Sequence, residues 1–246
     1  MRELHREAGT IAPAGAGAGR LVARRDLDQG VRDAMLALLS AHFAGVTRET
    51  FDEDLSGKDH VILLEDEGGV LHGFSTLHVY ESGAAGWPVT VIYSGDTIVR
   101  REAWASPLLA RTWIHAVAQL TWGRGTDVYW LLLTSGFRTY RFLPVFYRHF
   151  HPRFDEPTPD GERQLIDAIA AERFGSAYDR SRGLVRFPRP QVLKPGLLEI
   201  PSGRARDPHI AFFLQANPGY VEGDELVCLT RVDEDNLTPA GRRMLR

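Results

Sequence analysis

Three side chains in the predicted α/β segment can move protons, and two of them, Asp96 and Glu102, lie near a junction between a strand and a helix. Asp96 lies inside the run VTVIYSGDTIV, and Glu102 lies just beyond its end. A carboxylate can accept a proton as a general base, and the phenol of Tyr147 can donate one as a general acid. Each residue also has an ordinary interpretation, as a solvated or salt-bridged strand carboxylate or as a tyrosine of an aromatic core.

A predicted strand and a predicted helix must position these groups. The strand spans 89–102 and contains Gly95, and a glycine inside a strand often marks a bulge or a close backbone approach. The helix spans 107–122 and opens with Pro107, whose missing N–H costs nothing at the first helical position. The junction between them, REAWASPLLA, has no glycine. A helix start presents unpaired N–H groups to anions, so this junction raises the question of a phosphate ligand.

The other periodic segments complete an alternating order. Apolar spacing predicts β-α-α-β-β-β-α-β-α over residues 20–150. The predicted strands are 20–27, 60–67, 70–82, 89–102 and 128–135, and the predicted helices are 29–43, 47–56, 107–122 and 136–150. Further helices are predicted at 163–175 and 209–220, and a last strand at 224–232. The long segment between these two helices is rich in Pro, Gly and Arg, as lids and binding loops often are.

This pattern predicts an α/β (α+β) fold in three segments. Residues 1–19, with the run APAGAGAG, are expected to form a flexible N-terminal segment. Residues 20–152 form the predicted core, and residues 153–246 form a C-terminal extension that completes or covers its sheet.

Composition argues against several classes of protein. Of the 246 residues, 43% are hydrophobic and 25% are charged, as in globular proteins, and the net charge of −3 gives no basic field for nucleic acid. No apolar run reaches the ~18 residues of a membrane-spanning helix, and the N-terminus lacks the apolar core of a signal peptide. Cys228 is the only cysteine, which fits a cytoplasmic location. No HExxH spacing occurs, so no metal site is expected.

The order of elements and the residues at its junctions resemble the GNAT acyltransferase superfamily. In GNAT proteins the fourth strand is bulged and separates from the fifth, and the acyl-thioester arm lies in that gap. Gly95 in YSGDT matches the bulge, and the strand feeds directly into the helix where the family binds pyrophosphate. Tyr147 in FYRHF is similar to a late tyrosine that often protonates the leaving thiolate. The resemblance covers about half of the chain and implies a mixed central sheet with splayed strands, flanked by helices.

The resemblance also implies roles for particular positions. The donor, an acyl-CoA or an acyl-phosphopantetheine, would contact Ile98, Val99, Arg101, Trp104, Ala105, Ser106, Leu108, Thr134 and Ser135. A small-molecule acceptor with an amine or hydroxyl would lie near Tyr80, Tyr93, Arg138 and Tyr140. Asp96 or Glu102 would take the acceptor's proton, Tyr147 would act as acid, and an N–H near Ile98 or Val99 would stabilise the oxyanion.

The junction departs from the family pattern of Arg or Gln, two residues, Gly, one residue, and Gly or Ala. Here Ala and Ser replace the glycines, and Pro107 removes one N–H. One explanation is a donor on acyl-carrier protein, because VLKPGLL and DPHIAFF are similar to segments of bacterial GNAT-like enzymes that move long acyl chains. The alternative is a catalytically silent scaffold that binds a ligand or partner protein. The sequence leaves both open.

Overall fold

The computed structural model describes residues 10–11, 17–84, 86–204 and 206–246. The predicted flexible segment 1–19 therefore lies largely outside the described residues. Within them, no helix has the length and apolar character needed to cross a membrane.

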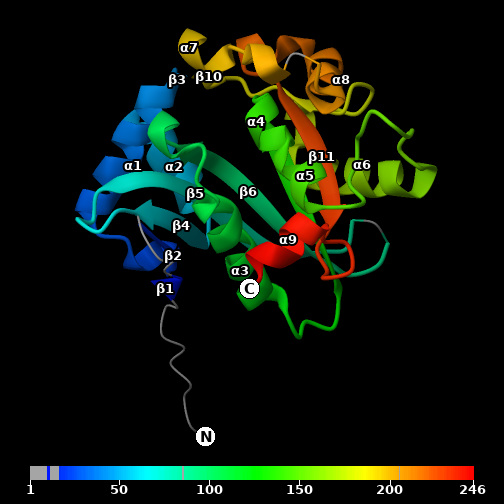
Figure 1. The fold of residues 1–246 in the computed structure, drawn as a ribbon. Helices are drawn as coiled ribbons and strands as arrows, with labels where there is room; N and C mark the ends of the chain where they lie inside the picture. Colours follow the sequence, from blue (N-terminus) through cyan, green and yellow to red (C-terminus); the bar gives the residue numbers. More distant parts are fainter. Residues whose placement is uncertain (1–9, 12–16, 85, 205) are drawn as a thin grey trace, which may run out of the picture.

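The described strands form one large mixed sheet. Its order is β1-β2-β4-β5-β6-β7-β11-β9-β8, and β6 and β7 are the one parallel pair within the described sheet (Figure 1). The strands are β1 (Thr10–Ile11), β2 (Ala18–Ala23), β4 (His60–Glu65), β5 (Leu71–Ser82), β6 (Val89–Val99), β7 (Asp127–Thr134), β8 (Tyr178–Asp179), β9 (Leu184–Val185) and β11 (Glu225–Arg231). Two further short strands, β3 (Phe43–Ala44) and β10 (Val192–Leu193), pair with each other. The predicted mixed sheet is thus confirmed, and the extension beyond residue 152 supplies β11, which lies beside β7.

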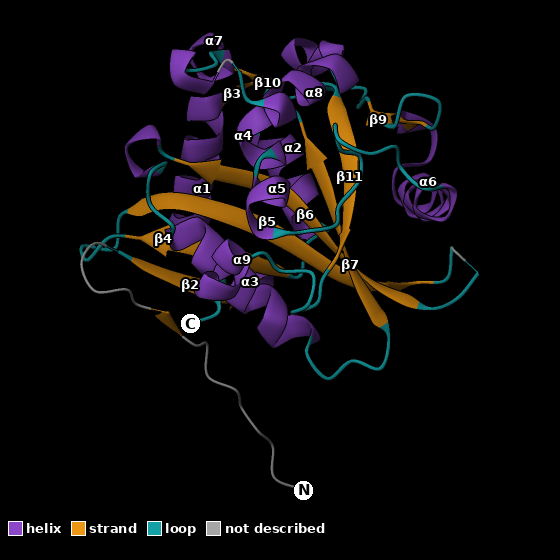
Figure 2. Cartoon of the chain, turned by 45° about the vertical axis from the view of Figure 1, so that its right-hand side comes forward, coloured by secondary structure: helices purple, strands orange, loops and turns teal. Residues whose placement is uncertain are grey.

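Helices cover both faces of this sheet. One face packs on α3 (Leu108–Thr121), α5 (Phe142–Phe146) and α8 (Pro208–Ala216), and α9 (Pro239–Met244) lies against α3 and α5 (Figure 2). The other face packs on α1 (Gln29–His42) and α2 (Arg48–Ser56) at one end and on α6 (Asp160–Phe174) at the other. Alternation along the strands explains this arrangement. In β4, Val61 and Leu63 face α1 while Ile62 and Leu64 face α3.

The central strand β6 contains a bulge. Ser75 of β5 pairs with Thr97, but Leu77 pairs with Ser94, so the single residue Thr76 lies opposite both Gly95 and Asp96. The bulge predicted from Gly95 is therefore confirmed. The parallel ladder between β6 and β7 ends at Ser94 and Leu132, although both strands continue beyond it. From the bulge onward, β6 follows β5 and leaves β7.

The segment after β7 is not the single helix predicted for 136–150. It forms two short helices, α4 (Phe137–Tyr140) and α5, and the second ends at Phe146. Pro144 has no N–H to donate to the carbonyl of Tyr140, and proline disfavours helical geometry at the residue before it. These effects fit the break between α4 and α5. Tyr147, just after the end of α5, has an extended backbone and forms an isolated bridge with Leu237.

Helix α3 packs closely on β2 at Gly19. A Cβ at Gly19 would lie 1.9 Å from Oγ1 of Thr112, a fully buried residue of α3. We expect Gly19→Ala to lower stability by about 1–3 kcal/mol, because one of the two elements must move. The matched control is Gly161→Ala in α6, where a Cβ would meet nothing within 4 Å. Equal melting temperatures for the two variants would contradict this account of the packing.

Candidate functional site

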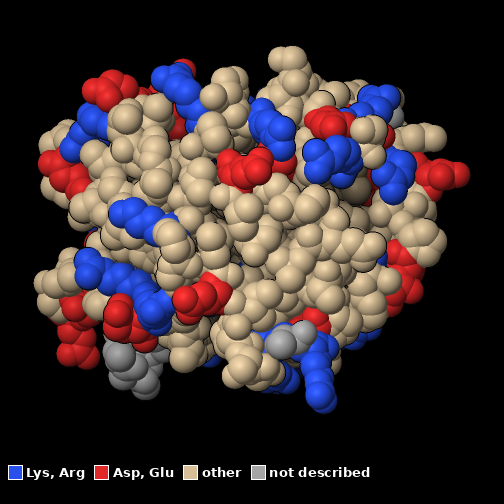
Figure 3. Space-filling model, turned by 90° about the horizontal axis from the view of Figure 1, so that it is seen from above, with Lys and Arg blue, Asp and Glu red and all other residues tan. Residues whose placement is uncertain are grey.

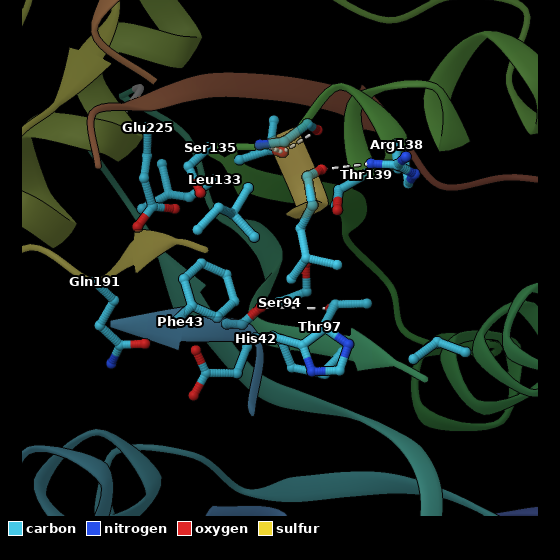
Figure 4. A pocket seen from close by; sticks show the side chains of 18 of the residues that line it. His42, Phe43, Ser94, Thr97, Leu133, Ser135, Arg138, Thr139, Gln191 and Glu225 are labelled. Carbon is cyan, nitrogen blue, oxygen red and sulfur yellow. Dashed lines mark hydrogen bonds between the residues drawn. The ribbon is translucent and has the colours of Figure 1, made fainter. Parts of the chain in front are cut away.

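A cavity of about 1080 Å³ opens where β6 and β7 separate. Its wall includes Ser94 and Thr97 of β6, Leu133 of β7 and Ser135 just after β7 (Figure 4). The volume suits a substrate of cofactor size, since ligand sites commonly enclose about 300–1,000 Å³.

The cavity passes from one face of the sheet to the other. Leu108 and Phe142 line it from the face covered by α3 and α5. Asp54 of α2 and Arg173 of α6 line it from the opposite face. The missing β6–β7 pairing is what makes this possible, because a continuous ladder would close the sheet. Two substrates can therefore approach one point from opposite faces.

One end of the cavity holds a cluster of charged side chains around Tyr93. Asp96 comes from the bulge in β6, and Glu225 comes from the first residue of β11. Neither carboxylate has a side-chain hydrogen bond or ion pair among the described residues. Beneath Gly95, the buried Lys58 instead donates to Asp54, with Nζ 2.5 Å from Oδ1 and 3.1 Å from the backbone oxygen.

Burial and nearby negative charges raise the pKa of both carboxyl groups. The pKa of Asp96 is raised to about 7, first by burial and then by the negative charge of Asp54, against the opposing effect of Lys58. The pKa of Glu225 is raised to about 8 by burial, Asp96 and Asp54. The two acids therefore titrate as a pair near neutral pH, where a general base works best.

The other end of the cavity is cationic. The guanidinium of Arg138 lies over the ring of Trp104 at 4.1 Å and over that of Phe137 at 4.5 Å, and Arg101 lies over the same indole at 5.4 Å. Trp104 is fixed in turn, because its Nε1 donates to the carbonyl of Val99 at 2.8 Å. In Figure 4, Arg138 and Glu225 lie toward opposite sides of the cavity.

The glycine-free junction leaves a modified helix start. Arg101–Ala103 forms a turn of 3-10 helix, and α3 begins at Leu108, with Pro107 at the capping position rather than at the predicted first helical position. Pro107 has no N–H, and the N–H of Leu108 is 3.2 Å from Oγ of Ser106. Two of the groups that a phosphate would use at a helix start are thus missing or already bonded.

The structure brings most of the predicted site residues together. Those that line the cavity are Tyr93, Asp96, Ile98, Val99, Trp104, Ser106, Leu108, Thr134, Ser135 and Arg138. Thr134 also has a structural role, because its hydroxyl donates to the carbonyl of Gly136 at 2.8 Å. Those outside the cavity wall are Tyr80, Arg101, Glu102, Ala105, Tyr140 and Tyr147.

The residues outside the wall have identifiable surroundings. Glu102 is exposed on the 3-10 turn. Tyr140 is fully buried, and its hydroxyl donates to the carbonyl of Pro152 at 3.0 Å. Tyr147 is 2% exposed and packs on Trp130, with ring centroids 5.8 Å apart. Burial raises the pKa of its phenol far above the ordinary value. The early end of α5 accounts for the position of Tyr147.

The sequence pattern did not identify Glu225 or Arg173. Glu225 follows the turn-rich run NPGYVEGD, and nothing in the sequence places it beside the bulge. Its position follows from the antiparallel register of β11 on β7, where Leu226 lies opposite Thr134. Among the described residues, no group of three or more His, Cys, Asp or Glu side chains is arranged to hold a metal ion.

The order of elements, the bulge and the separated parallel pair give this chain a GNAT-like fold. No protein-family model matches the chain, and no curated protein matches it. Solved structures are similar to the chain at low identity, and three of them serve as examples. A GNAT-family N-acetyltransferase from Escherichia coli in complex with CoA has 13% identity and a TM-score of 0.39, covering 54% of this chain and 70% of its own. A probable N-acyltransferase from Enterococcus faecalis has 13% identity and a TM-score of 0.41, covering 54% of this chain and 33% of its own. A GCN5-related N-acetyltransferase from Kribbella flavida has 10% identity and a TM-score of 0.40. The match covers 92% of this chain and 68% of the Kribbella flavida chain.

The raised pKa of Asp96 predicts a dependence of stability on pH. Because its pKa is about 7 when folded and 3.8 in the ordinary state, this carboxyl holds its proton more tightly in the folded protein. Its contribution therefore favours folding below about pH 4 and is lost as pH rises toward 7. We expect Asp96→Asn to raise the melting temperature at pH 8 by about 2–4 °C, and less at pH 5. The exposed control Glu222→Gln should show no such difference, and a gain for Asp96→Asn that is equal at both pH values would contradict the assignment.

Proposed function

We propose that this chain is an acyltransferase that moves an acyl group from a thioester donor to an amine or hydroxyl of a small-molecule acceptor. The observation that carries the proposal is the cavity through the splayed sheet, with the Asp96–Glu225 pair at the bulge. A reaction between two bound substrates needs such a meeting point, because holding the reacting groups together supplies much of the rate.

The donor, acyl-CoA or acyl-phosphopantetheine, lies in our proposal along the free edge of β6. The N–H of Arg100 donates to His72 in β5, and the direction of N–H groups alternates along a strand. Ile98 therefore directs its N–H toward β5, while Val99 and Thr97 direct theirs toward the gap. We assign oxyanion stabilisation to one of these two amides. Trp104, Ser106, Leu108, Thr134 and Ser135 would line the arm.

The acceptor enters, in our proposal, from the face of α2 and α6, beside Tyr93 and Arg173. Its nitrogen or oxygen attacks the thioester carbonyl, a bond to that carbon forms, and the C–S bond breaks. The Asp96–Glu225 pair takes the proton that the nucleophile loses, and the sulfur leaves as a thiolate that is then protonated. Glu102 is exposed outside the cavity and takes no part in this proposal.

Removing the base should slow transfer. We expect Asp96→Asn to lower kcat by about a hundredfold or more, with a smaller effect on donor affinity. In the wild type, kcat should rise with pH through about 7, because the base acts in its ionised form. The measurement is steady-state thiol release from acetyl-, decanoyl- and palmitoyl-CoA and from acyl-carrier protein, with a panel of amines and alcohols, and Glu222→Gln is the control. If calorimetry finds that the wild type binds none of these donors, the catalytic proposal is wrong and the silent scaffold replaces it.

The role of Tyr147 as leaving-group acid stays a prediction from the sequence, and one substitution decides it. Because the phenol lies outside the cavity wall and packs on Trp130, we expect Tyr147→Phe to leave kcat within about twofold of the wild type. A loss of about a hundredfold, the effect of removing an acid catalyst, would reinstate the role. Circular dichroism and the melting temperature would show whether such a loss came from misfolding.

A further inference from the structure

A segment of the C-terminal extension closes the cationic end of the cavity. We call residues 194–204 the strap. It follows β10, and Lys194 anchors it by donating its N–H to His42 at 2.9 Å and its Nζ to the carbonyl of Ser40 at 2.7 Å. The strap contains α7 (Pro195–Leu198) and a turn of 3-10 helix. It adds Leu197, Leu198, Pro201 and Arg204 to the cavity wall. Figure 1 shows α7 and β10 above the sheet, next to β3.

Two arginines of the core hold the strap by its backbone. Arg138 donates to the carbonyl of Leu197 at 2.7 Å and to that of Glu199 at 3.2 Å. Arg101 donates to the carbonyl of Gly196. Three backbone oxygens of the strap therefore accept hydrogen bonds from guanidinium N–H groups at the cationic end of the cavity.

The charges of these arginines have no acidic partner. Arg101, Arg138 and Arg204, here called the arginine cluster, form no ion pair with a carboxylate within 4.0 Å among the described residues. Burial and the positive charges of Arg101 and Arg204 lower the pKa of Arg138. Neutral carbonyls satisfy the geometry of a guanidinium but not its charge. The cluster therefore has unused affinity for an anion.

The face of the molecule that carries α7 and α8 has side chains of both charges. Figure 3 shows the molecule from the side of α7 and α8, where Lys and Arg side chains are interspersed with Asp and Glu. Beside the arginine cluster, the helix start has lost two of its N–H donors to Pro107 and Ser106, so a phosphate bound there must find its compensating charge elsewhere.

We propose that the arginine cluster binds a phosphate group of the donor, and that the strap carbonyls occupy the positions of its oxygens until the donor enters. This inference rests on the proposed function. The planar guanidiniums fixed on Trp104 suit the two-oxygen recognition of a phosphate. The phosphate can come from two sources, the diphosphate of coenzyme A or the phosphodiester of a pantetheine arm on a carrier protein. In either case the strap must release Arg101 and Arg138.

The test is calorimetric binding of pantetheine, 4′-phosphopantetheine, coenzyme A and holo acyl-carrier protein to the full chain. We expect wild type to bind the phosphate-bearing ligands at least tenfold more tightly than pantetheine. Arg138→Gln and Arg204→Gln should each lose about tenfold or more for those ligands and little for pantetheine. Arg138→Lys should recover part of the loss. The matched control is Arg206→Gln, an exposed arginine that does not line the cavity.

Each outcome has one meaning. If wild type and Arg138→Gln bind phosphopantetheine equally, the arginine cluster is not a phosphate site, while acyl transfer by the same proteins would leave the proposed function intact. If the wild type binds none of the four ligands, the proposed function fails and this inference fails with it. Coenzyme A binding more tightly than the carrier protein identifies the diphosphate as the source, and the reverse identifies the carrier.

Release of the strap has its own readout. Amide hydrogen exchange in residues 195–204 should become faster when phosphopantetheine saturates the protein, because the carbonyls of Gly196, Leu197 and Glu199 lose their partners. Exchange in the strap that slows or stays the same would show that the phosphate does not replace these carbonyls.

Discussion

The candidate site depends on the point where β6 and β7 stop pairing. Up to Ser94 and Leu132 the two strands form an ordinary parallel ladder, and beyond it β6 remains paired only with β5. The extra residue of the bulge turns β6 away, which exposes one row of its backbone amides and opens both faces of the sheet to one cavity. The bulge also places Asp96 in the wall of that cavity. A regular strand would close the gap and pair these backbone amides with β7.

The core alone does not complete this site. Glu225 comes from β11, Arg173 from α6 and Arg204 from the strap, all of which follow residue 152. The extension thus adds a carboxylate at one end of the cavity and a cation at the other. Because β11 pairs with β7 in an antiparallel register, the position of Glu225 is as well fixed as that of the core residues.

The sequence predicted the scaffold well because periodicity reports burial directly. The strands predicted at 60–67 and 70–82 and the helix predicted at 29–43 recur as β4, β5 and α1. The helix predicted at 47–56 recurs as α2, and Oγ1 of Thr47 caps it at 3.2 Å from the N–H of Thr50. The bulge was also predicted, since Gly95 is a local signal. Long-range packing was harder to predict. The segment predicted as one helix over 136–150 instead forms α4 and α5, which ends at Phe146, and Tyr147 lies outside the cavity wall. Glu225 carried no local signal, because its environment arises only when β11 joins the sheet.

The two ends of the cavity pose one physical problem with different solutions. Removing a charge from water costs free energy unless a partner compensates it, and among the described residues neither Asp96 and Glu225 nor the arginine cluster forms an ion pair. The carboxylates respond by retaining protons near neutral pH, as the raised pKa values of Asp96 and Glu225 show. Arginine cannot give up its proton under such conditions, so the cluster is satisfied by the strap carbonyls instead. The carboxylates can exchange their protons with a bound substrate. The arginines can bind a substrate only after it displaces the strap. The same deficit of counter-charge therefore suits the acidic end to proton transfer and the basic end to binding.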